Sequence, residues 1–379
     1  MTIKTQRLLV RAKKIAKKGN TEEARKLFTE ILEASPNNKE AKNGLLALEQ
    51  AKDQLKPSKS EIQSLVALYS NDQIEEALDS AATLIKDYPN EPLLYNISGA
   101  CNKKIDQLND AVESFEKAVA LKPDYTEAQY NLGITLKELG QVDAAIKCYE
   151  DTLAIKHAYP NVHNNLGNIF LERSQLDDAV DHFEWAVAYQ PEFEMAHNNL
   201  GSALLELGQV DAAIESYEKA LAINTDYFEA HNNLGIAFHR LGQLEAAVKS
   251  YESALAVNPD YAEAHNNLGV TLRELGQLDA AVKSFEKALT INPDYANAYN
   301  NLGITLKDHG QLDAAVESYE KALTLKPDYA EAHNNLGNAF KALGQLNDAV
   351  KFYEKALTIN PDYALAQNNL DIALKELSS

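Results

Sequence analysis

The chain has 379 residues, 45% of them apolar, and a formal net charge of −20. This is the composition of a folded, soluble protein, and the acidic balance excludes a general nucleic-acid binder, which needs a basic stripe to displace counterions. The charge is uneven, because residues 1–57 hold 13 Lys/Arg against 7 Asp/Glu. The acidic remainder is interpreted as a means of staying in solution, and attraction of basic partners is the alternative.

The sequence favours a cytoplasmic protein without metal or cofactor. Cys101 and Cys148 match neither a disulfide framework nor the spacing of metal ligands. Apolar runs fall short of the roughly 20 residues of a membrane span. The basic N-terminus lacks the apolar core and cleavage site of a secretory signal.

A phrase of 34 residues recurs along most of the chain. Residues 262–295 and 330–363 both begin Ala-Glu-Ala-His-Asn-Asn-Leu-Gly and end Asn-Pro-Asp-Tyr. A fixed period of this size is typical of a solenoid, in which each supersecondary unit packs on its neighbours. The period therefore overrides the two or three ordinary domains that the length alone would suggest.

Taken in order, the chain begins with a degenerate repeat at 1–38, whose first helix is basic. Residues 39–57 break the period and are predicted to form one extra helix or linker that ends before Pro57. Tandem repeats, nine in all, then follow over 58–363, and residues 364–379 add one capping helix with a polar outer face. The basic first helix is interpreted as a solvated end, and contact with an acidic surface or a membrane is the alternative.

Each repeat is predicted to be a pair of antiparallel helices. In 262–295, Asp260 and Glu263 have the spacing of a capping box before the first helix. Gly276 ends that helix, and Asp279 suits the positive end of the second. Gly269 is expected to be small because the two helices approach closely there. The same Asp-x-x-Glu spacing occurs at Asp124/Glu127, Asp226/Glu229 and Asp328/Glu331.

The small and apolar positions of the repeat form a recognisable set. In 262–295 they are Leu268, Gly269, Leu272, Ala281, Phe285, Ala288 and Pro293. This set resembles the signature of the tetratricopeptide repeat family, over residues 58–379 and more weakly over 5–38. The resemblance implies an all-α fold, a right-handed superhelical α-solenoid of stacked antiparallel helix pairs whose first helices line a concave groove.

Two positions of the first helix are unusual, counting each repeat from its first residue. Position 6 is Asn131, Asn165, Asn199, Asn233, Asn267, Asn301, Asn335 and Asn369. Position 5 is Asn164, Asn198, Asn232, Asn266, Asn300, Asn334 and Asn368. Asn costs about 0.6 kcal/mol against Ala inside a helix, so its recurrence suggests a use. Helical rotation places both positions opposite the core, where amides that donate and accept could hold an extended polypeptide backbone.

A similar asparagine ladder is known in the superhelical arm of O-linked N-acetylglucosamine transferases, and the position-6 series matches it. Two alternatives stay open, namely copying of Asn by recent duplication and bonding of Asn to the neighbouring repeat.

The His residues at position 4 are interpreted as packing residues, because helices about 10 Å apart cannot share a metal ion. The charged residues at positions 12 and 13 are interpreted as a solvated helix edge, with groove contact as the alternative. Trp185 is a candidate anchor for a partner, with neutral drift as the alternative.

The sequence carries no signature of an enzyme, since Walker, dinucleotide and zinc-protease motifs and the nucleophile elbow are all absent from it. We therefore predict a non-catalytic scaffold that binds extended polypeptide in an asparagine-lined concave groove. Its partners are expected to be proteins or peptides. One alternative is the substrate-recruiting arm of a glycosyltransferase or sulfotransferase whose catalytic domain lies outside these residues. The second is a structural scaffold that assembles with itself.

Overall fold

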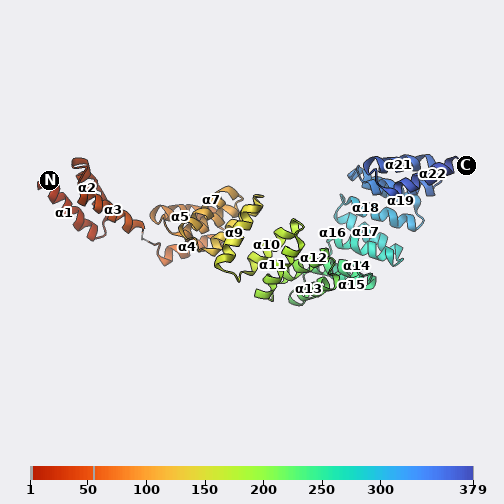
Figure 1. Ribbon diagram of the computed structural model, residues 1–379, viewed down its shortest axis with the longest axis horizontal. Coiled ribbons are helices and arrows are strands. Elements are labelled where there is room, and N and C mark those ends of the chain that lie inside the picture. The colour runs from red at the N-terminus through yellow and green to blue at the C-terminus, as the bar shows by residue number, and fades with distance from the viewer. Residues whose placement is uncertain (1–2, 54–55, 379) are drawn as a thin grey trace. The chain divides into compact units, whose positions relative to one another are not determined.

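The computed structural model describes residues 3–53 and 56–378. Within these ranges every regular element is an α-helix, and Figure 1 shows the helices following one another as short paired rods. The all-α class predicted from the repeat is confirmed. The contacts divide the chain into two compact units, residues 1–162 (the first unit) and 163–379 (the second unit).

Three helices at the start of the first unit form a small core of their own. α1 (Ile3–Lys17), α2 (Thr21–Ala34) and α3 (Lys39–Asp53) meet around Phe28, whose side chain is buried. Gly44 of α3 lies against this ring, and a Cβ at that position would overlap it. α3 is the predicted extra helix, and the last residues of its predicted length lie partly outside the described ranges.

The remaining helices alternate as the first and second members of antiparallel pairs, with even numbers for first helices and odd numbers for second helices. They are α4 (Lys59–Ser70), α5 (Ile74–Asp87), α6 (Pro92–Lys104), α7 (Leu108–Leu121), α8 (Thr126–Glu138), α9 (Val142–Ile155), α10 (Pro160–Glu172), α11 (Leu176–Tyr189), α12 (Glu194–Glu206), α13 (Val210–Ile223), α14 (Phe228–Arg240), α15 (Leu244–Val257), α16 (Ala262–Glu274), α17 (Leu278–Ile291), α18 (Ala296–Asp308), α19 (Leu312–Leu325), α20 (Ala330–Ala342), α21 (Leu346–Ile359) and α22 (Ala364–Leu377).

The turn within each helix pair requires a left-handed backbone. Gly276, predicted to end α16, has a φ of +74°. In three repeats a residue with a side chain holds the same place, namely Asp72, Asp106 and Ser174 with φ of +63°, +60° and +57°. Left-handed backbone is strained for such residues, so the packing of the two helices imposes the turn whichever residue occupies it.

The predicted capping boxes are wrong. α16 begins at Ala262, so its N-cap is Tyr261 rather than Asp260, and the Tyr261 side chain makes no capping hydrogen bond. The other three sites shift in the same way, with N-caps Tyr125, Tyr227 and Tyr329. Glu263 still lies in the first turn, where a negative charge suits the helix dipole.

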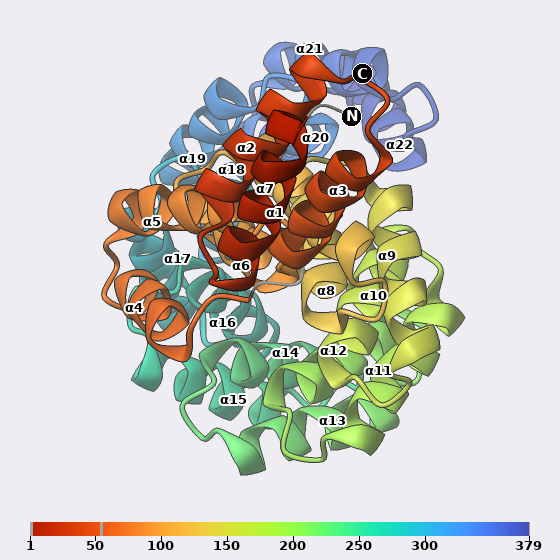
Figure 2. The same ribbon diagram turned by 90° about the vertical axis from the view of Figure 1, so that its left-hand side faces the viewer.

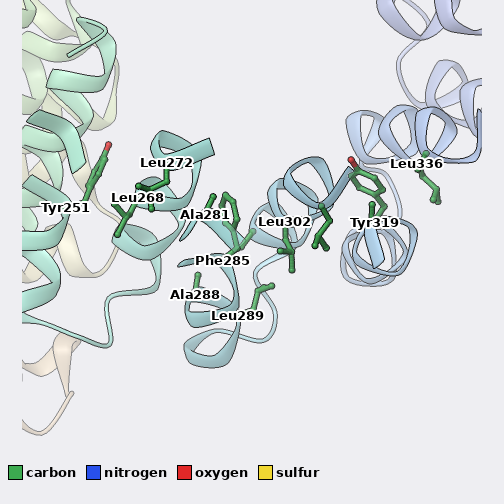
Figure 3. Packing of buried hydrophobic residues seen from close by; sticks show 14 of the residues in the cluster. Tyr251, Leu268, Leu272, Ala281, Phe285, Ala288, Leu289, Leu302, Tyr319 and Leu336 are labelled. Carbon is green, nitrogen blue, oxygen red and sulfur yellow. The ribbon is translucent and has the colours of Figure 1, made fainter. Parts of the chain in front are cut away.

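Each core layer joins the two helices of one repeat to the next repeat. Figure 3 shows this in the second unit, where Leu268 and Leu272 of α16 lie near Ala281 and Phe285 of α17. Phe285 is fully buried against Gly269, because a Cβ on Gly269 would lie only 2.8 Å from Cε1 and Cζ of the ring. The prediction that Gly269 is small because the helices approach closely is confirmed.

Successive first helices also contact one another directly. In the second unit α12 contacts α14, α14 contacts α16, α16 contacts α18, and α18 contacts α20. In Figure 2 the helices of this unit follow a curve, with α12 and α14 on its inner side and α13 and α15 on its outer side. Some side chains of a first helix therefore contact the first helix of the next repeat.

The last described helix, α22, exposes apolar side chains where a polar outer face was predicted. Leu374 and Leu377 of α22 are 44% and 42% exposed. They hold positions 11 and 14, where the other first helices face their own second helix. α22 keeps the apolar residues that these positions have in most of the other repeats, and no described second helix follows α22 to cover them.

Candidate binding surface on the first helices

One strip of each first helix faces the inner side. In α16 it consists of Glu263, Asn267, Val270 and Glu274, which are three or four residues apart and therefore share one side of the helix. These are positions 2, 6, 9 and 13 of the repeat. We call this set of positions, over all first helices, the inner strip.

The asparagines of neighbouring repeats are bonded to each other. In six pairs of the second unit, Nδ2 of a position-6 Asn donates to Oδ1 of the position-5 Asn one repeat earlier, whereas Asn165 follows a repeat with Tyr130 at position 5. The bonds are Asn199–Asn164 3.0 Å, Asn233–Asn198 3.0 Å, Asn267–Asn232 3.1 Å, Asn301–Asn266 3.0 Å, Asn335–Asn300 3.0 Å and Asn369–Asn334 2.8 Å. The first unit repeats the arrangement with Asn131 and Asn96 at 3.1 Å. The alternative use of Asn, bonding to the neighbouring repeat, is therefore realised in the structure.

The position-5 amides are buried by this arrangement. Asn232 and Asn334 are 0% exposed and Asn300 is 1% exposed, whereas helical rotation placed position 5 on the exposed side. Helical rotation within one helix pair leaves position 5 uncovered, but the first helix of the next repeat packs over the position-5 side chains. Asn368 in α22 is exposed, since no described repeat follows it.

The position-6 amides keep free hydrogen-bonding capacity. Asn199, Asn233 and Asn267 are half-buried, and each uses one N–H of its amide for the bond to the preceding repeat. The Oδ1 of Asn267 receives only a long bond from Asn266, at 3.4 Å. An amide offers two donors and two acceptor lone pairs, so each retains at least one donor and one acceptor.

A row of charged pairs runs along the other end of the first helices. A basic residue at position 12 lies within ion-pair distance of the position-13 carboxylate of the next repeat. The pairs are Lys103–Glu138 3.0 Å, His239–Glu274 3.1 Å, Arg273–Asp308 3.8 Å and Lys341–Glu376 3.0 Å. Exposed pairs of this kind contribute about 0–1 kcal/mol each, so they neutralise the strip more than they stabilise the stack.

Four of the His residues at position 4 tie their first helix to the loop before it. Nε2 of the imidazole lies at hydrogen-bond distance from the carbonyl oxygen six residues earlier. The pairs are His197–Pro191 2.9 Å, His231–Thr225 3.0 Å, His265–Pro259 3.0 Å and His333–Pro327 3.0 Å. Because the carbonyl can only accept, Nε2 carries the proton. The packing interpretation of these residues agrees with this geometry.

Trp185 lies on α11 with 47% of its surface exposed. Its ring stacks on Tyr189, with 5.6 Å between centroids. The same repeat brings Nδ1 of His163 and Nδ1 of His182 to 3.0 Å, so one of the two imidazoles donates to the other. Burial, and then the neighbouring His163, lower the pKa of His182, which favours the neutral form of His182.

Tetratricopeptide-repeat family models match most of the repeats. One matches residues 104–140, 201–242 and 305–344, and others match 124–192, 232–296, 284–317 and 330–363. Together they cover 104–192 and 201–363, which is more than half of the chain. The chain therefore belongs to the tetratricopeptide repeat family, and it is a protein–protein interaction module built on that fold.

Similar sequences include the peroxisomal targeting signal receptors of two yeasts. The receptor of Kluyveromyces lactis is 33% identical over 67 residues, which are 18% of this chain and 12% of the receptor. That of Saccharomyces cerevisiae is 29% identical over 77 residues, 20% of this chain and 13% of the receptor. The chain thus spans only a small part of the length of these relatives.

Two solved structures share the architecture. The Cut9–Hcn1 hetero-tetramer of the APC/C superposes with a TM-score of 0.55 at 18% identity, over 98% of this chain and 76% of that chain. PilW, a type IV pilus biogenesis factor, gives 0.52 at 24% identity, over 56% and 98%. At these identities the likeness concerns the fold, and it supports the predicted superhelical solenoid. Among the described residues, no helix is long and apolar enough to cross a membrane.

Proposed function

We propose that the inner strip binds an extended polypeptide through the position-6 asparagines. The observation that carries the proposal is the half-buried state of these amides, each held in one orientation by the preceding repeat. The fixed orientation reduces the side-chain entropy that a ligand must remove on binding. The position-5 asparagines, by contrast, act as supports for the ladder and not as contacts.

The spacing of the ladder suits an extended chain. Packed helices lie about 8–10 Å apart, and an extended polypeptide advances about 3.3 Å per residue. One Asn per repeat therefore meets the ligand backbone about every third residue. An amide can donate to a carbonyl or accept from an N–H, so recognition of this kind does not depend on the ligand's side chains.

The first unit has a hollow on the same strip. A cavity of about 450 Å³ is lined by Asn131, Ala100 and the Lys103–Glu138 pair, among others. Ala100 holds position 9, so a small residue leaves room there between the asparagine and the charged pair. The hollow gives a ligand side chain a place to enter beside the amide.

The proposal assigns no catalytic step to the chain. The position-13 carboxylates of the inner strip recur with the repeat, and those of Glu138 and Asp308 pair with the first helix of the preceding repeat. We place the protein in the cytoplasm, since Cys101 and Cys148 are free thiols, as in a reducing compartment. The transferase-arm and self-assembly alternatives gain no specific support from the contacts of the described residues.

Affinity capture with matched variants tests the proposal. Asn199, Asn233, Asn267, Asn301 and Asn335 are replaced by Ala in one protein. In the control, five exposed second-helix residues of the same repeats are replaced by Ala, namely Glu218, Glu252, Glu286, Glu320 and Glu354. We expect the control and the native chain to recover the same polypeptide and the asparagine variant to lose it while keeping its helical circular dichroism. Equal recovery by all three would contradict the proposal.

A further inference from the structure

A second row of side chains lies beside the asparagines in the second unit. The Tyr261 hydroxyl, at position 34, lies 3.4 Å from Oε2 of Glu263 and donates to it. Glu263 precedes Asn267 by one helical turn on the same side of α16. The Phe228 ring meets Tyr261 edge-on, with centroids 5.1 Å apart. We call the following set the tyrosine–glutamate row: Glu194, Tyr227, Glu229, Tyr261, Glu263 and Tyr295.

The chain's own lysines show what the position-34 ring accepts. Where position 31 is Lys, its ammonium lies over the ring three residues later. The pairs are Lys122–Tyr125 5.0 Å, Lys156–Tyr159 4.4 Å and Lys326–Tyr329 4.8 Å from Nζ to the ring centroid. These are cation–π distances, so the ring at this position of the repeat is an acceptor for a primary ammonium.

In three successive repeats of the second unit, position 31 is Asn instead of Lys. Each Asn accepts a backbone N–H two residues later, as Asn258 does from residue 260 at 3.2 Å. Asn224 and Asn292 make the same turn, at 3.1 Å and 3.2 Å. The rings at 227, 261 and 295 are half-exposed and carry no lysine from their own repeat.

Carboxylates lie next to these three rings. Burial, and then the Glu263 carboxylate, raise the pKa of both Tyr261 and Tyr295. Burial, then Glu229 and Glu194, raise the pKa of Tyr227. None of these three carboxylates takes part in an ion pair within the described ranges, whereas Asp308 and Glu376, at position 13, are paired with Arg273 and Lys341. The row therefore combines aromatic faces with negative charge that the chain does not neutralise.

We propose that the tyrosine–glutamate row binds Lys or Arg side chains of the extended polypeptide, one in each repeat. The inference rests on the proposed function, because it takes the same ligand to lie along the position-6 asparagines. First helices lie about 8–10 Å apart, and an extended ligand in the polyproline II conformation advances about 3.1 Å per residue with three residues per turn, so the basic residues fall at every third position and on one side of the ligand. The partner is thus a basic segment, which complements the chain's net charge of −20.

Three labelled peptides and the full chain test this by fluorescence anisotropy. One peptide has four Ser-Ala-Lys triplets, the second four Ser-Ala-Gln triplets, and the third has the composition of the first with its lysines consecutive. We expect the Ser-Ala-Lys peptide to bind at least ten-fold more tightly than the other two. Its advantage should shrink with added salt, because charged contacts at the surface are screened.

A variant that supplies the missing lysines makes the test specific. Asn224→Lys, Asn258→Lys and Asn292→Lys copy the residue that covers the ring in the sister repeats. The control places the same three charges two residues earlier, at the exposed positions Ala222, Ala256 and Thr290. We expect the first variant to lose the preference for the Ser-Ala-Lys peptide and the control to keep it. Replacing Tyr227, Tyr261 and Tyr295 by Leu should also abolish the preference for the Ser-Ala-Lys peptide, and replacing them by Phe should preserve this preference.

The outcomes separate this inference from the proposed function. Equal binding of the Ser-Ala-Lys and Ser-Ala-Gln peptides, abolished by the five-asparagine variant, would overturn the inference and leave the asparagine groove standing. Equal loss of the preference in the position-31 variant and its charge control would also overturn it, by showing a general charge effect. Binding of no peptide by the native chain would count against both.

Discussion

Asn267 donates from Nδ2 to Oδ1 of Asn232, a residue 35 positions earlier in the chain, across 3.1 Å. The bond joins two successive first helices, and its counterparts repeat along the second unit. Asn232 is fully buried and Asn267 half-buried, so one amide supports and the other is presented. The buried Asn orients the half-buried Asn, and the half-buried asparagines of successive repeats together form the candidate binding surface.

The shared bond predicts strong coupling between the two residues. Asn232→Ala and Asn267→Ala should each lower the free energy of opening of α14 and α16 by about 1 kcal/mol, since each removes one partner of the same hydrogen bond. The double variant should cost about as much as one single variant. Native-state hydrogen exchange measures this locally, which suits a solenoid that need not unfold in two states. Simple addition of the two effects would show that the bond is not the shared cause.

The contact of Gly269 with Phe285 predicts a steric penalty. A Cβ on Gly269 would lie 2.8 Å from the ring, so Gly269→Ala should destabilise the fold by about 1–3 kcal/mol and Gly269→Leu by more. Combining Gly269→Ala with Phe285→Leu should cost less than the sum of the two, because the smaller side chain removes the overlap. Chemical denaturation, with exposed Ala256→Leu as control, checks both statements. A stability of Gly269→Leu equal to that of the native chain would refute the packing.

The left-handed turn predicts opposite effects at two matched positions. Ser174 has a φ of +57°, so Ser174→Gly should stabilise the protein by about 1 kcal/mol through relief of backbone strain. Gly276 has a φ of +74° at the corresponding turn, so Gly276→Ser should destabilise by a similar amount. Thermal melting of the two variants gives the signs. Shifts in the same direction would mean that the side chain at this turn matters for another reason.

The buried imidazole of His333 predicts a loss of stability in acid. Burial, with Lys355 adding to it and the Pro327 carbonyl opposing it, lowers the pKa of His333 below its ordinary value of 6.5. The unfolded chain then takes up a proton more readily than the folded one, so the contribution is neutral well above pH 6.5. Stability falls as the pH drops from 6.5 toward the folded-state pKa.

A natural substitution provides the control for that prediction. Gln129 stands where other repeats have His, and its Nε2 donates to the Pro123 carbonyl at 3.1 Å. His333→Gln should therefore keep the bond to Pro327 and flatten the pH dependence of stability between about pH 7 and pH 5. Melting curves across this range compare the variant with the native chain. An unchanged pH profile would place the acid sensitivity on other groups.

The repeat itself was sufficient to predict the helix pairs, the turn at Gly276 and the close approach at Gly269. These depend on contacts within one repeat, and a 34-residue pattern records such contacts directly. The capping boxes failed because the Pro-Asp-Tyr segment carries the chain one residue further before the helix begins at Ala262.

The role of position 5 depends on a contact between repeats, and a single-helix rotation cannot contain it. Asn232 is opposite its own core and still buried, because the next first helix covers it. The pairs between positions 12 and 13 were hidden for the same reason, since Arg273 and Asp308 are neighbours only when repeats stack. Asn96 was missed because its repeat has the amide at position 5 alone, and only its bond to Asn131 identifies it.

Site-specific photocrosslinking tests the central claim, that an extended polypeptide lies along the inner strip, most directly. A photoreactive phenylalanine analogue replaces Val270, between the asparagine and the charged pair on α16, or Glu286, exposed on α17. The account predicts that irradiation in a lysate of the organism that makes the protein links a polypeptide to the position-270 protein and not to the position-286 protein. It also predicts that the product disappears when the position-270 protein also carries the five Asn→Ala replacements. A partner linked from position 286 alone, or linked from position 270 regardless of the asparagines, would contradict it.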